Sequence, residues 1–403
     1  MKLMVYSHDA FGLGNIRRMV AICDYLLKAI PNISILVVSG SPALHQLRLP
    51  VGLDYIKLPC LGRDQHGNMS VRFLNAEFED TLRLRGELIR TATANFQPDV
   101  LLVDKKPNGL RGELQPTLDY LQAPSAQTRL VLLLRDILDS PAVTIAQWQR
   151  DRYYTLAETL YDQIWIVGTP DIFDAPTAYQ FSPLLRSKTR FMGYIRRSAG
   201  LQSPTGLRSA LGVRSTEQLV LVTPGGGADG FHLVDTYLHS LNEYQPEQRT
   251  ISLVISGPEM SATDKRKLLP RISALDDCHW LEFTHDLASY MTAADVVVSM
   301  GGYNTIGEIV SLKRRAVVVP RIHPVEEQWI RTQRMAELGL FTTIHPNELT
   351  PARLSQALRQ ELQTQSSSTT EYSLDLHASP RITAALLGLL KEARPEAKPE
   401  LVA

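Results

Sequence analysis

The sequence lacks several features that would assign a protein class at once. Its 42 basic and 42 acidic residues cancel, so the basic excess of a nucleic-acid-binding protein is absent. No apolar run reaches the roughly 18 residues that a membrane-spanning helix needs. The three cysteines, Cys23, Cys60 and Cys278, are scattered without metal-ligand spacing and are typical of reduced thiols. We therefore expect a cytoplasmic protein that binds no nucleic acid and contacts a membrane at most peripherally.

What the sequence does contain is a regular alternation of short apolar strands with helices. The 403 residues, of which 44% are hydrophobic and 21% charged, suffice for two or three globular domains. Strands that alternate with helices predict parallel, doubly wound sheets. The alternation occurs on both sides of residues 196–206, a stretch rich in Gly, Ser, Pro and Arg that indicates a linker. We predict an α/β protein with two Rossmann-like domains that face each other across a cleft.

The most informative stretch lies in the second half, between residues 294 and 340. A buried strand over 295–299 leads into the glycine-rich turn 300–304, and a helix that opens at Thr305 carries Glu308. A second strand ends at residue 320, and another helix starts near residue 326. Glycine lets the backbone approach phosphate, and helix N-termini offer free N–H groups with a partial positive charge. This arrangement suits a nucleoside diphosphate, although a glycine turn can also simply join a strand to a helix.

Residues 300–309, 319–323 and 326–328 together resemble the donor-site signature of GT-B glycosyltransferases, closest to the MurG-like type with a glycosyltransferase family 28 C-terminal domain. The resemblance implies a UDP-sugar site with the ribose on Glu308, the diphosphate on the turn at Gly301 to Thr305, and the sugar hydroxyls on the second helix start. The donor-binding residues assigned in this way are Gly225, Gly226, Gly227, Thr284, Gly301, Gly302, Asn304, Thr305, Glu308, His323, Glu327, Gln328 and Arg197.

Three of these assignments lie outside the main signature. Three consecutive glycines, Gly225 to Gly227, follow an apolar strand and fit close approach to a phosphate. The resembling enzymes have serine at the position of Gly227, so one hydroxyl contact must come from the backbone here. The resemblance places the uracil near Thr284, held by backbone groups. It places Arg197 near the diphosphate, and the alternative for Arg197 is an exposed linker charge.

The first strand ends in a Gly-x-Gly turn, which contains Gly12 and Gly14 and leads to Asn15, interpreted as a helix N-cap. A dinucleotide fingerprint would need a third glycine where Arg17 stands, so we do not predict NAD binding. In the resembling enzymes this turn faces the acceptor and ends in histidine, which Asn15 replaces. The general base therefore has to be sought elsewhere.

Two residues at the end of this strand, His8 and Asp9, are the candidates for the base that removes the acceptor proton. Their alternative role is turn capping. The residues assigned to the acceptor are Gly12, Gly14, Asn15 and Lys105.

Charged residues also follow two later strands, at Asp104 to Lys106 and at Arg135 and Asp136. Charges at the carboxyl ends of parallel strands point into the ligand crevice. The cations could meet an anionic acceptor such as a lipid phosphate, or could pair with the neighbouring Asp104 and Asp136, which is the interpretation we favour. The polar stretch 60–71 is interpreted as a loop, either on the acceptor side or a mobile linker.

The predicted domains are an N-terminal acceptor-side domain (1–195), the linker (196–206), a nucleotide-sugar-binding domain (207–375), and a helix with a polar tail (376–403). The resemblance implies that this last helix crosses back to the N-terminal domain. The predicted function is transfer of a hexose or N-acetylhexosamine from a UDP-sugar to an acceptor hydroxyl, which the resemblance implies to be inverting. The sequence does not identify the acceptor, for which a lipid-linked or polysaccharide glycan is the candidate. We expect no cofactor and no metal, because no Asp-x-Asp pair lies beside the donor motifs.

Two alternatives remain at this point. One is a UDP-sugar 2-epimerase or hydrolase on the same fold, with Asp104, Asp136 and His8 acting on the sugar. The other is a non-catalytic nucleotide-sugar-binding protein, which the replacement of histidine by Asn15 favours.

Overall fold

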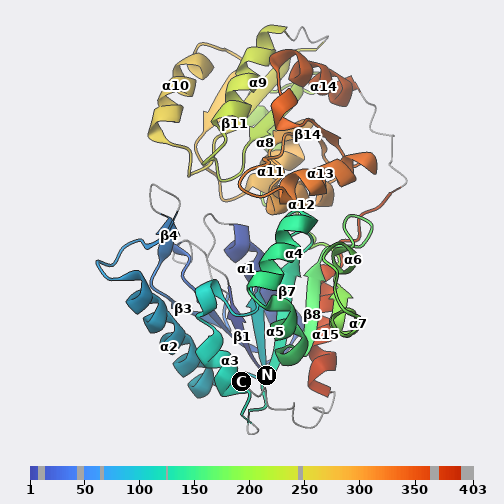
Figure 1. Ribbon diagram of the computed structural model, residues 1–403. Helices are drawn as coiled ribbons and strands as arrows, with labels where there is room; N and C mark the ends of the chain where they lie inside the picture. Colours follow the sequence, from blue (N-terminus) through green and yellow to red (C-terminus); the bar gives the residue numbers. More distant parts are fainter. Residues whose placement is uncertain are drawn as a thin grey trace. The chain divides into compact units, whose positions relative to one another are not determined.

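The computed structural model describes residues 1–7, 14–42, 50–63, 68–123, 126–243, 248–363 and 372–391. The chain divides into two compact units (Figure 1). The first unit comprises Met1–Ile195 and His377–Ala403, and the second comprises Arg196–Leu376. Each unit is built on its own parallel sheet, so the predicted α/β class is confirmed.

The first unit contains a seven-stranded parallel sheet in the order β3-β2-β1-β6-β7-β8-β9. Its central strands are continuous apolar runs, which is the pattern expected for parallel strands buried on both faces. The strands are β1 (Lys2–Tyr6), β2 (Ser34–Ser39), β3 (Leu53–Lys57), β6 (Val100–Asp104), β7 (Arg129–Arg135), β8 (Gln163–Val167) and β9 (Thr189–Phe191).

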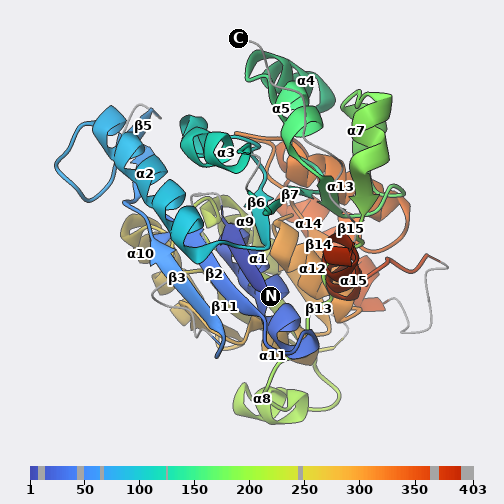
Figure 2. The same cartoon turned by 90° about the horizontal axis from the view of Figure 1, so that it is seen from below.

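Helices cover both faces of this sheet. Figure 2 shows α2, α3 and α5 along one side and α1 with α15 along the other. The buried core on the first side joins sheet residues such as Met4 and Leu101 to Ile89 of α2 and Leu118 of α3. The helices of this unit are α1 (Gly14–Ala29), α2 (Phe78–Phe96), α3 (Gln115–Leu121), α4 (Pro141–Arg150), α5 (Tyr153–Leu160), α6 (Ala175–Ala178), α7 (Pro183–Lys188) and α15 (Ala378–Lys391), with the 3-10 helix η2 (Leu110–Gly112).

Several local expectations for the first unit were wrong. Within the stretch expected to be a loop, β4 (Leu61–Arg63) and β5 (Met69–Val71) form an antiparallel hairpin, because both ends of that stretch contain apolar residues that pair across it. The helix α1 already includes Gly14, so Asn15 lies in its first turn and does not cap it. The helices α4 and α5 are separated by a break at Arg152, which has a left-handed backbone conformation.

The second unit contains a six-stranded parallel sheet in the order β12-β11-β10-β13-β14-β15. The order reverses between β10 and β13, which makes their carboxyl ends the topological switch point of the sheet. The strands are β10 (Gln218–Thr223), β11 (Thr250–Ile255), β12 (Cys278–Leu281), β13 (Val296–Ser299), β14 (Arg315–Val318) and β15 (Thr342–Thr343).

The helices of the second unit pack their apolar faces onto this sheet. They are α8 (Pro204–Ala210), α9 (Phe231–Glu243), α10 (Ala262–Ser273), α11 (Leu287–Ala293), α12 (Tyr303–Ser311), α13 (Glu327–Glu337) and α14 (Pro351–Gln363), with η3 (Pro346–Glu348). The helix α8 begins inside the stretch interpreted as a linker. Ser203 caps it by accepting a hydrogen bond from the Gly206 amide, and Pro204 occupies the first helical position, where proline is favoured.

Candidate functional site

The candidate site is the switch point of the second sheet, where two glycine turns lie side by side. The strands β10 and β13 pair in parallel up to Thr223 and Ser299, so the turns that follow them start at the same edge. A Cβ on Gly225 in the first turn would lie 3.5 Å from Oγ1 of Thr305, in the first turn of α12. The structure therefore brings together the glycine run 225–227 and the N-terminus of α12, two features that the sequence separates by about eighty residues.

The glycine run also contacts the turn that follows β11. The Glu259 amide donates a hydrogen bond of 2.8 Å to the carbonyl of Gly226. Gly227 has φ +93°, and a Cβ there would lie 2.1 Å from the carbonyl oxygen of Ser256. No side chain fits at this position, which explains why the residue cannot be the serine of the resembling enzymes.

The glycine turn after β13 is fixed from the other side by α13. A Cβ on Gly301 would lie 2.9 Å from Thr332 and 3.2 Å from the Cβ of Gln328. The fully buried Arg331 donates to the Gly301 carbonyl over 3.3 Å, and its guanidinium lies 4.0 Å from the carboxylate of Glu327. Sequence analysis missed Arg331, although its position four residues after Glu327 on one helix could have indicated it.

We expect Gly301→Ser to destabilise the second unit by about 1–3 kcal/mol, because the added atoms overpack the contact with α13. The same substitution at the neighbouring Gly302 is the matched control. Gly302 precedes α12 as its N-cap, and a Cβ there would meet only Thr305, at 3.9 Å. Since serine is a good N-cap residue, Gly302→Ser should leave stability unchanged or raise it slightly. Urea unfolding of both variants checks this, and equal effects would contradict the packing argument.

The two residues expected to contact the sugar hydroxyls are buried within the second unit. Glu327 and Gln328 are 4% and 6% exposed. The side-chain oxygen of Gln328 accepts a hydrogen bond of 3.2 Å from the backbone amide of Arg321. Gln328 therefore also holds the segment that follows β14, a structural role that the sequence did not indicate. His323 lies in the same segment and is exposed.

Arg197 lies along α12, so it is not the exposed linker charge that was the alternative. Its guanidinium donates to Oδ1 of Asn304 over 2.6 Å, and its backbone amide donates to Oγ of Ser311 over 3.0 Å. The side chain is half-buried. A guanidinium held at the first turn of α12 adds a fixed positive charge to the partial charge of the helix terminus.

A second cation near the glycine turns is Arg321, which lies within the donor-site signature but was given no role in the sequence analysis. Its guanidinium lies 3.5 Å from the carboxylate of Asp229, in the turn after β10. Because Arg321 directly follows Pro320, which contacts Gly301, this ion pair connects the segments on either side of the site. Both side chains are exposed, so the pair contributes little to stability and can exchange partners readily.

The remaining donor-site candidates lie at helix starts of the second unit. Glu308 is half-buried in the second turn of α12. Oγ1 of Thr284 accepts from the amide of Asp286, which caps α11 and accepts from Ser289. Burial raises the pKa of Asp286, but hydrogen bonds from Ser289 and from the Leu201 amide outweigh burial and hold the pKa below its ordinary value.

In the first unit, several predicted residues cannot be assessed or have other roles. His8, Asp9 and Gly12 lie outside the described residues, and only the backbone of Asn15 is described, beside Gly14 at the start of α1. The prediction of a base at His8 or Asp9 therefore stays a prediction.

The acidic residues at the ends of β6 and β7 hold contacts that the sequence did not indicate. Fully buried Asp104 accepts a hydrogen bond of 2.6 Å from Arg18 of α1, and buried Asp136 accepts one of 2.7 Å from the hydroxyl of Tyr194. The sequence indicated neither of these remote donors, and the pairing of the adjacent cations with the two carboxylates stays a prediction. Lys105 follows β6 with φ +67°, and its amide donates to the Leu133 carbonyl.

Two further properties bear on the kind of site. In the described ranges, no group of three or more His, Cys, Asp or Glu residues is placed to hold a metal ion. Among the helices that the structure describes, none combines the length and apolarity needed to cross a bilayer.

Comparison with known families assigns a domain type to the part of the chain that contains the candidate site. Residues 219–380, which contain both glycine turns, match the glycosyltransferase family 28 C-terminal domain. The chain is 27% identical over 200 residues to an uncharacterized glycosyltransferase of Methanopyrus kandleri, covering 49% of this chain and 53% of the relative. It is 26% identical over 185 residues to the UDP-N-acetylglucosamine–N-acetylmuramyl-(pentapeptide) pyrophosphoryl-undecaprenol N-acetylglucosamine transferase of Bordetella pertussis, covering 45% and 49%. The chain thus spans about half the length of the curated relatives it matches.

Solved structures share the fold over nearly the whole chain. MurG of Acinetobacter baumannii superposes with a TM-score of 0.59 at 14% identity, over 96% of this chain and 99% of that one. The UDP-GlcNAc 2-epimerase of Methanocaldococcus jannaschii superposes with a TM-score of 0.62 at 11% identity, over 96% and 100%. Residues 219–380 are therefore similar to a glycosyltransferase family 28 C-terminal domain, and the chain has the two-domain GT-B fold of MurG-like glycosyltransferases.

Proposed function

We propose that this protein transfers a hexose or N-acetylhexosamine from a UDP-sugar to an acceptor hydroxyl, with inversion at the anomeric carbon. The observation that carries the proposal is the convergence of the glycine run 225–227, the N-terminus of α12 and Arg197 at one switch point. Such a place binds phosphate groups through backbone N–H groups and fixed positive charge. The match to a glycosyltransferase domain over these residues supports the same conclusion.

The chemistry that these groups can supply is stabilisation of the leaving UDP. As the bond to the anomeric carbon breaks, negative charge develops on the diphosphate. The amides at the start of α12 and the guanidinium of Arg197 would stabilise that charge without a metal ion. Glu308, in the second turn of the same helix, would accept hydrogen bonds from the ribose hydroxyls. Asp9 or His8 would remove the proton of the acceptor hydroxyl.

The second candidate is a UDP-sugar 2-epimerase or hydrolase, since epimerases share the fold. Transfer is favoured because Asp104 and Asp136, the carboxylates that this alternative would use, are fully buried and bonded to Arg18 and Tyr194. Incubation with UDP-GlcNAc and no acceptor separates the two enzymes, because only an epimerase changes the configuration at C2. If the protein binds UDP-GlcNAc but does not turn it over, whichever acceptor is added, it is a non-catalytic nucleotide-sugar-binding protein.

Binding of UDP is the first test of the proposal. At a ligand concentration of 100 times Kd, binding to the native state adds about 2.7 kcal/mol, which should raise the Tm of a unit of this size by about 5–10 °C. We expect this shift with UDP and one UDP-sugar in a metal-free buffer that contains a chelator. GDP-mannose and NAD are the controls and should give no shift. An absent response to every uridine nucleotide would overturn the donor site.

A further inference from the structure

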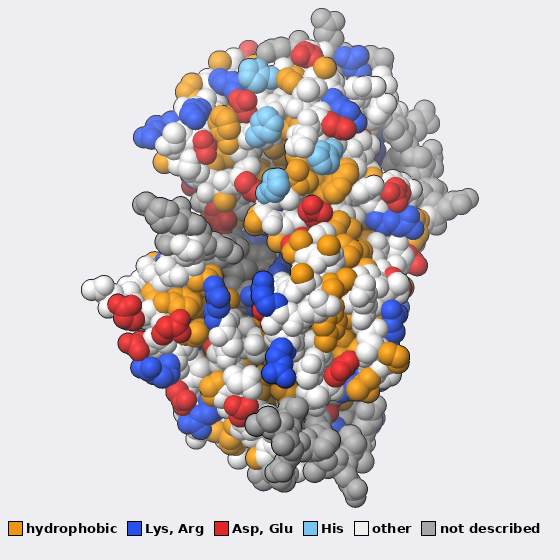
Figure 3. All heavy atoms as spheres, in the orientation of Figure 1, with side chains coloured by type: hydrophobic (Ala, Val, Ile, Leu, Met, Phe, Trp, Pro, Cys, Tyr) orange, Lys and Arg blue, Asp and Glu red, His pale blue; other side chains and the backbone are white. Residues whose placement is uncertain are grey.

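The first unit contains a polar pocket of about 730 Å³ that no step of the proposed donor chemistry uses. It is formed by the segment after β6 together with η2, the end of α4 and the start of β5. A smaller cavity of about 340 Å³ adjoins it and shares Asn68, Met69 and Arg111. A pocket of this size accommodates a small ligand. Figure 3 shows Lys and Arg side chains gathered around a hollow of the first unit.

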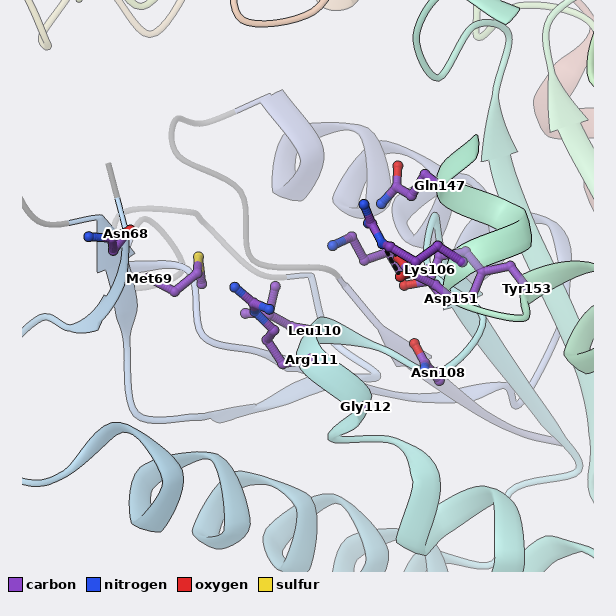
Figure 4. A pocket seen from close by; sticks show the side chains of 11 residues that line it. Asn68, Met69, Lys106, Asn108, Leu110, Arg111, Gly112, Gln147, Asp151 and Tyr153 are labelled. Carbon is purple, nitrogen blue, oxygen red and sulfur yellow. Dashed lines mark hydrogen bonds and ion pairs between the residues drawn. The ribbon is translucent and has the colours of Figure 1, made fainter. Parts of the chain in front are cut away.

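Positive charge dominates the lining of this pocket. It contains three cations, Lys106, Arg111 and Arg150, and one carboxylate, Asp151. In Figure 4, Lys106 and Arg111 extend from the segment after β6 into the same open space, and Gln147 reaches toward it from α4. The carboxylate of half-buried Asp151 lies 2.9 Å from the guanidinium of exposed Arg150. The lining therefore carries an excess of positive charge, together with side-chain amides that can donate hydrogen bonds.

Arg111 has a backbone conformation that is energetically unfavourable for a residue with a side chain. Arg111 has φ +52° and lies between Gly109 at φ +74° and Gly112 at φ +85°. The left-handed region disfavours residues that carry a Cβ, and glycine would fit this turn better than arginine. The conformation of this turn therefore fixes the direction in which the Arg111 side chain leaves the backbone.

A buried network holds the backbone of Leu110, the pocket residue that precedes Arg111. The hydroxyl of Tyr6 accepts from the Leu110 amide over 3.0 Å and donates to Glu113 over 2.6 Å. Glu113 is in turn bridged by both ends of the Arg85 guanidinium, at 2.5 and 2.8 Å. All of these side chains are buried. A preorganised turn of this kind holds its cation in place before the ligand arrives.

We propose that this pocket binds a phosphate or diphosphate group of the acceptor, with Arg111 and Lys106 as its principal ligands. A dianion suits three cations with one carboxylate better than a neutral sugar does, and guanidinium groups bind phosphate in bidentate fashion. Only the designation of the ligand as acceptor rests on the proposed transferase function. Tyr153 supports the site as a donor, since burial raises its pKa to about 12 and keeps its hydroxyl protonated at neutral pH.

Arg152 provides a matched control, because it has the same side chain in the same backbone conformation. Its φ is +54°, it is exposed, and it is not part of the pocket lining. Arg111→Gly and Arg152→Gly each remove one positive charge and relieve one left-handed non-glycine residue. Their effects on stability and net charge should match, so a difference in affinity reports the pocket alone.

The test is calorimetric titration of the full-length protein, held at saturating UDP to occupy the donor site, with glucose 1-phosphate and with farnesyl phosphate in detergent. We expect Arg111→Gly to weaken binding at least about tenfold, as for loss of a hydrogen bond to a charged group. Arg152→Gly should stay within about twofold, since its charge is screened at 0.15 M salt. Lys106→Gln should weaken binding in the same direction as Arg111→Gly.

The two titrants also identify the source of the phosphate. Tighter binding of farnesyl phosphate assigns the site to a lipid-linked acceptor, and tighter binding of glucose 1-phosphate assigns it to a soluble sugar phosphate. Equal losses for the two arginine variants, or no binding of either titrant, overturn the proposal. If UDP itself does not bind, the transferase proposal fails and the titration is run without UDP. The comparison of Arg111→Gly with Arg152→Gly then still shows whether the pocket binds phosphate.

Discussion

Glu308→Ala is expected to lower the affinity for UDP and for the UDP-sugar about 10- to 100-fold while the protein stays folded. The carboxylate is placed to accept hydrogen bonds from the ribose hydroxyls, and charge-assisted bonds of this kind contribute about 1.5–3 kcal/mol. Glu308 is half-buried on α12, so its truncation leaves no large cavity. Isothermal titration calorimetry measures the affinity, and circular dichroism with urea unfolding confirms the fold.

The control for this variant is Glu337→Ala, which removes the same group from another helix of the second unit. Glu337 forms an exposed pair with Arg334 over 3.0 Å, and such pairs contribute at most about 1 kcal/mol to stability. Its affinity for UDP should equal that of the parent protein. Unchanged affinity in Glu308→Ala, with an intact fold, would remove the ribose assignment and move the nucleoside to another part of the sheet edge.

The sheets could be predicted because their strands carry a strong local signal. The strand β7 spans Arg129–Arg135 and consists of five consecutive apolar residues between two arginines, and the strands on either side are similarly apolar. A parallel strand is buried on both faces, so its whole length is apolar and its ends are clear in the sequence. The signal is weak in short polar segments. The hairpin of β4 and β5 and the helix α8 depend on pairing and capping, and both were taken for irregular chain.

Contacts between side chains were much less predictable than strands. The resemblance placed Arg197 near the diphosphate, but only the fold shows that Asn304 and Ser311 of α12 hold it. The pairing of Arg18 with Asp104 joins residues 86 positions apart, and no sequence spacing encodes it. Arg331 and Arg321 were given no role because a single arginine on a helix or in a loop is typical of an ordinary surface charge.

A second large effect is expected from Arg85→Met, at the buried network below the pocket. Arg85 and Glu113 are both fully buried, and the variant leaves the Glu113 carboxylate without its guanidinium partner. Breaking a buried pair from one side costs about 3–5 kcal/mol, since the remaining charge stays away from water. We therefore expect the free energy of unfolding of the first unit to fall by this amount.

The comparison that isolates this cause uses two further variants. Arg83→Met makes the same substitution on the same helix, where Arg83 forms an exposed pair with Asp80, and should change stability by at most about 1 kcal/mol. Arg85→Met combined with Glu113→Leu removes both charges, and should recover much of the loss because a buried pair can be replaced by apolar side chains at little cost.

Hydrogen exchange with mass spectrometry reads the effect in each unit separately. Peptides from β1 and α2 should lose protection in Arg85→Met, while peptides from β10 and β13 of the second unit serve as an internal reference and should not change. If the double variant is as unstable as Arg85→Met, the loss comes from the packing of the long arginine side chain and not from an uncompensated charge. The stability of the first unit would then depend on the volume of the Arg85 side chain more than on its charge.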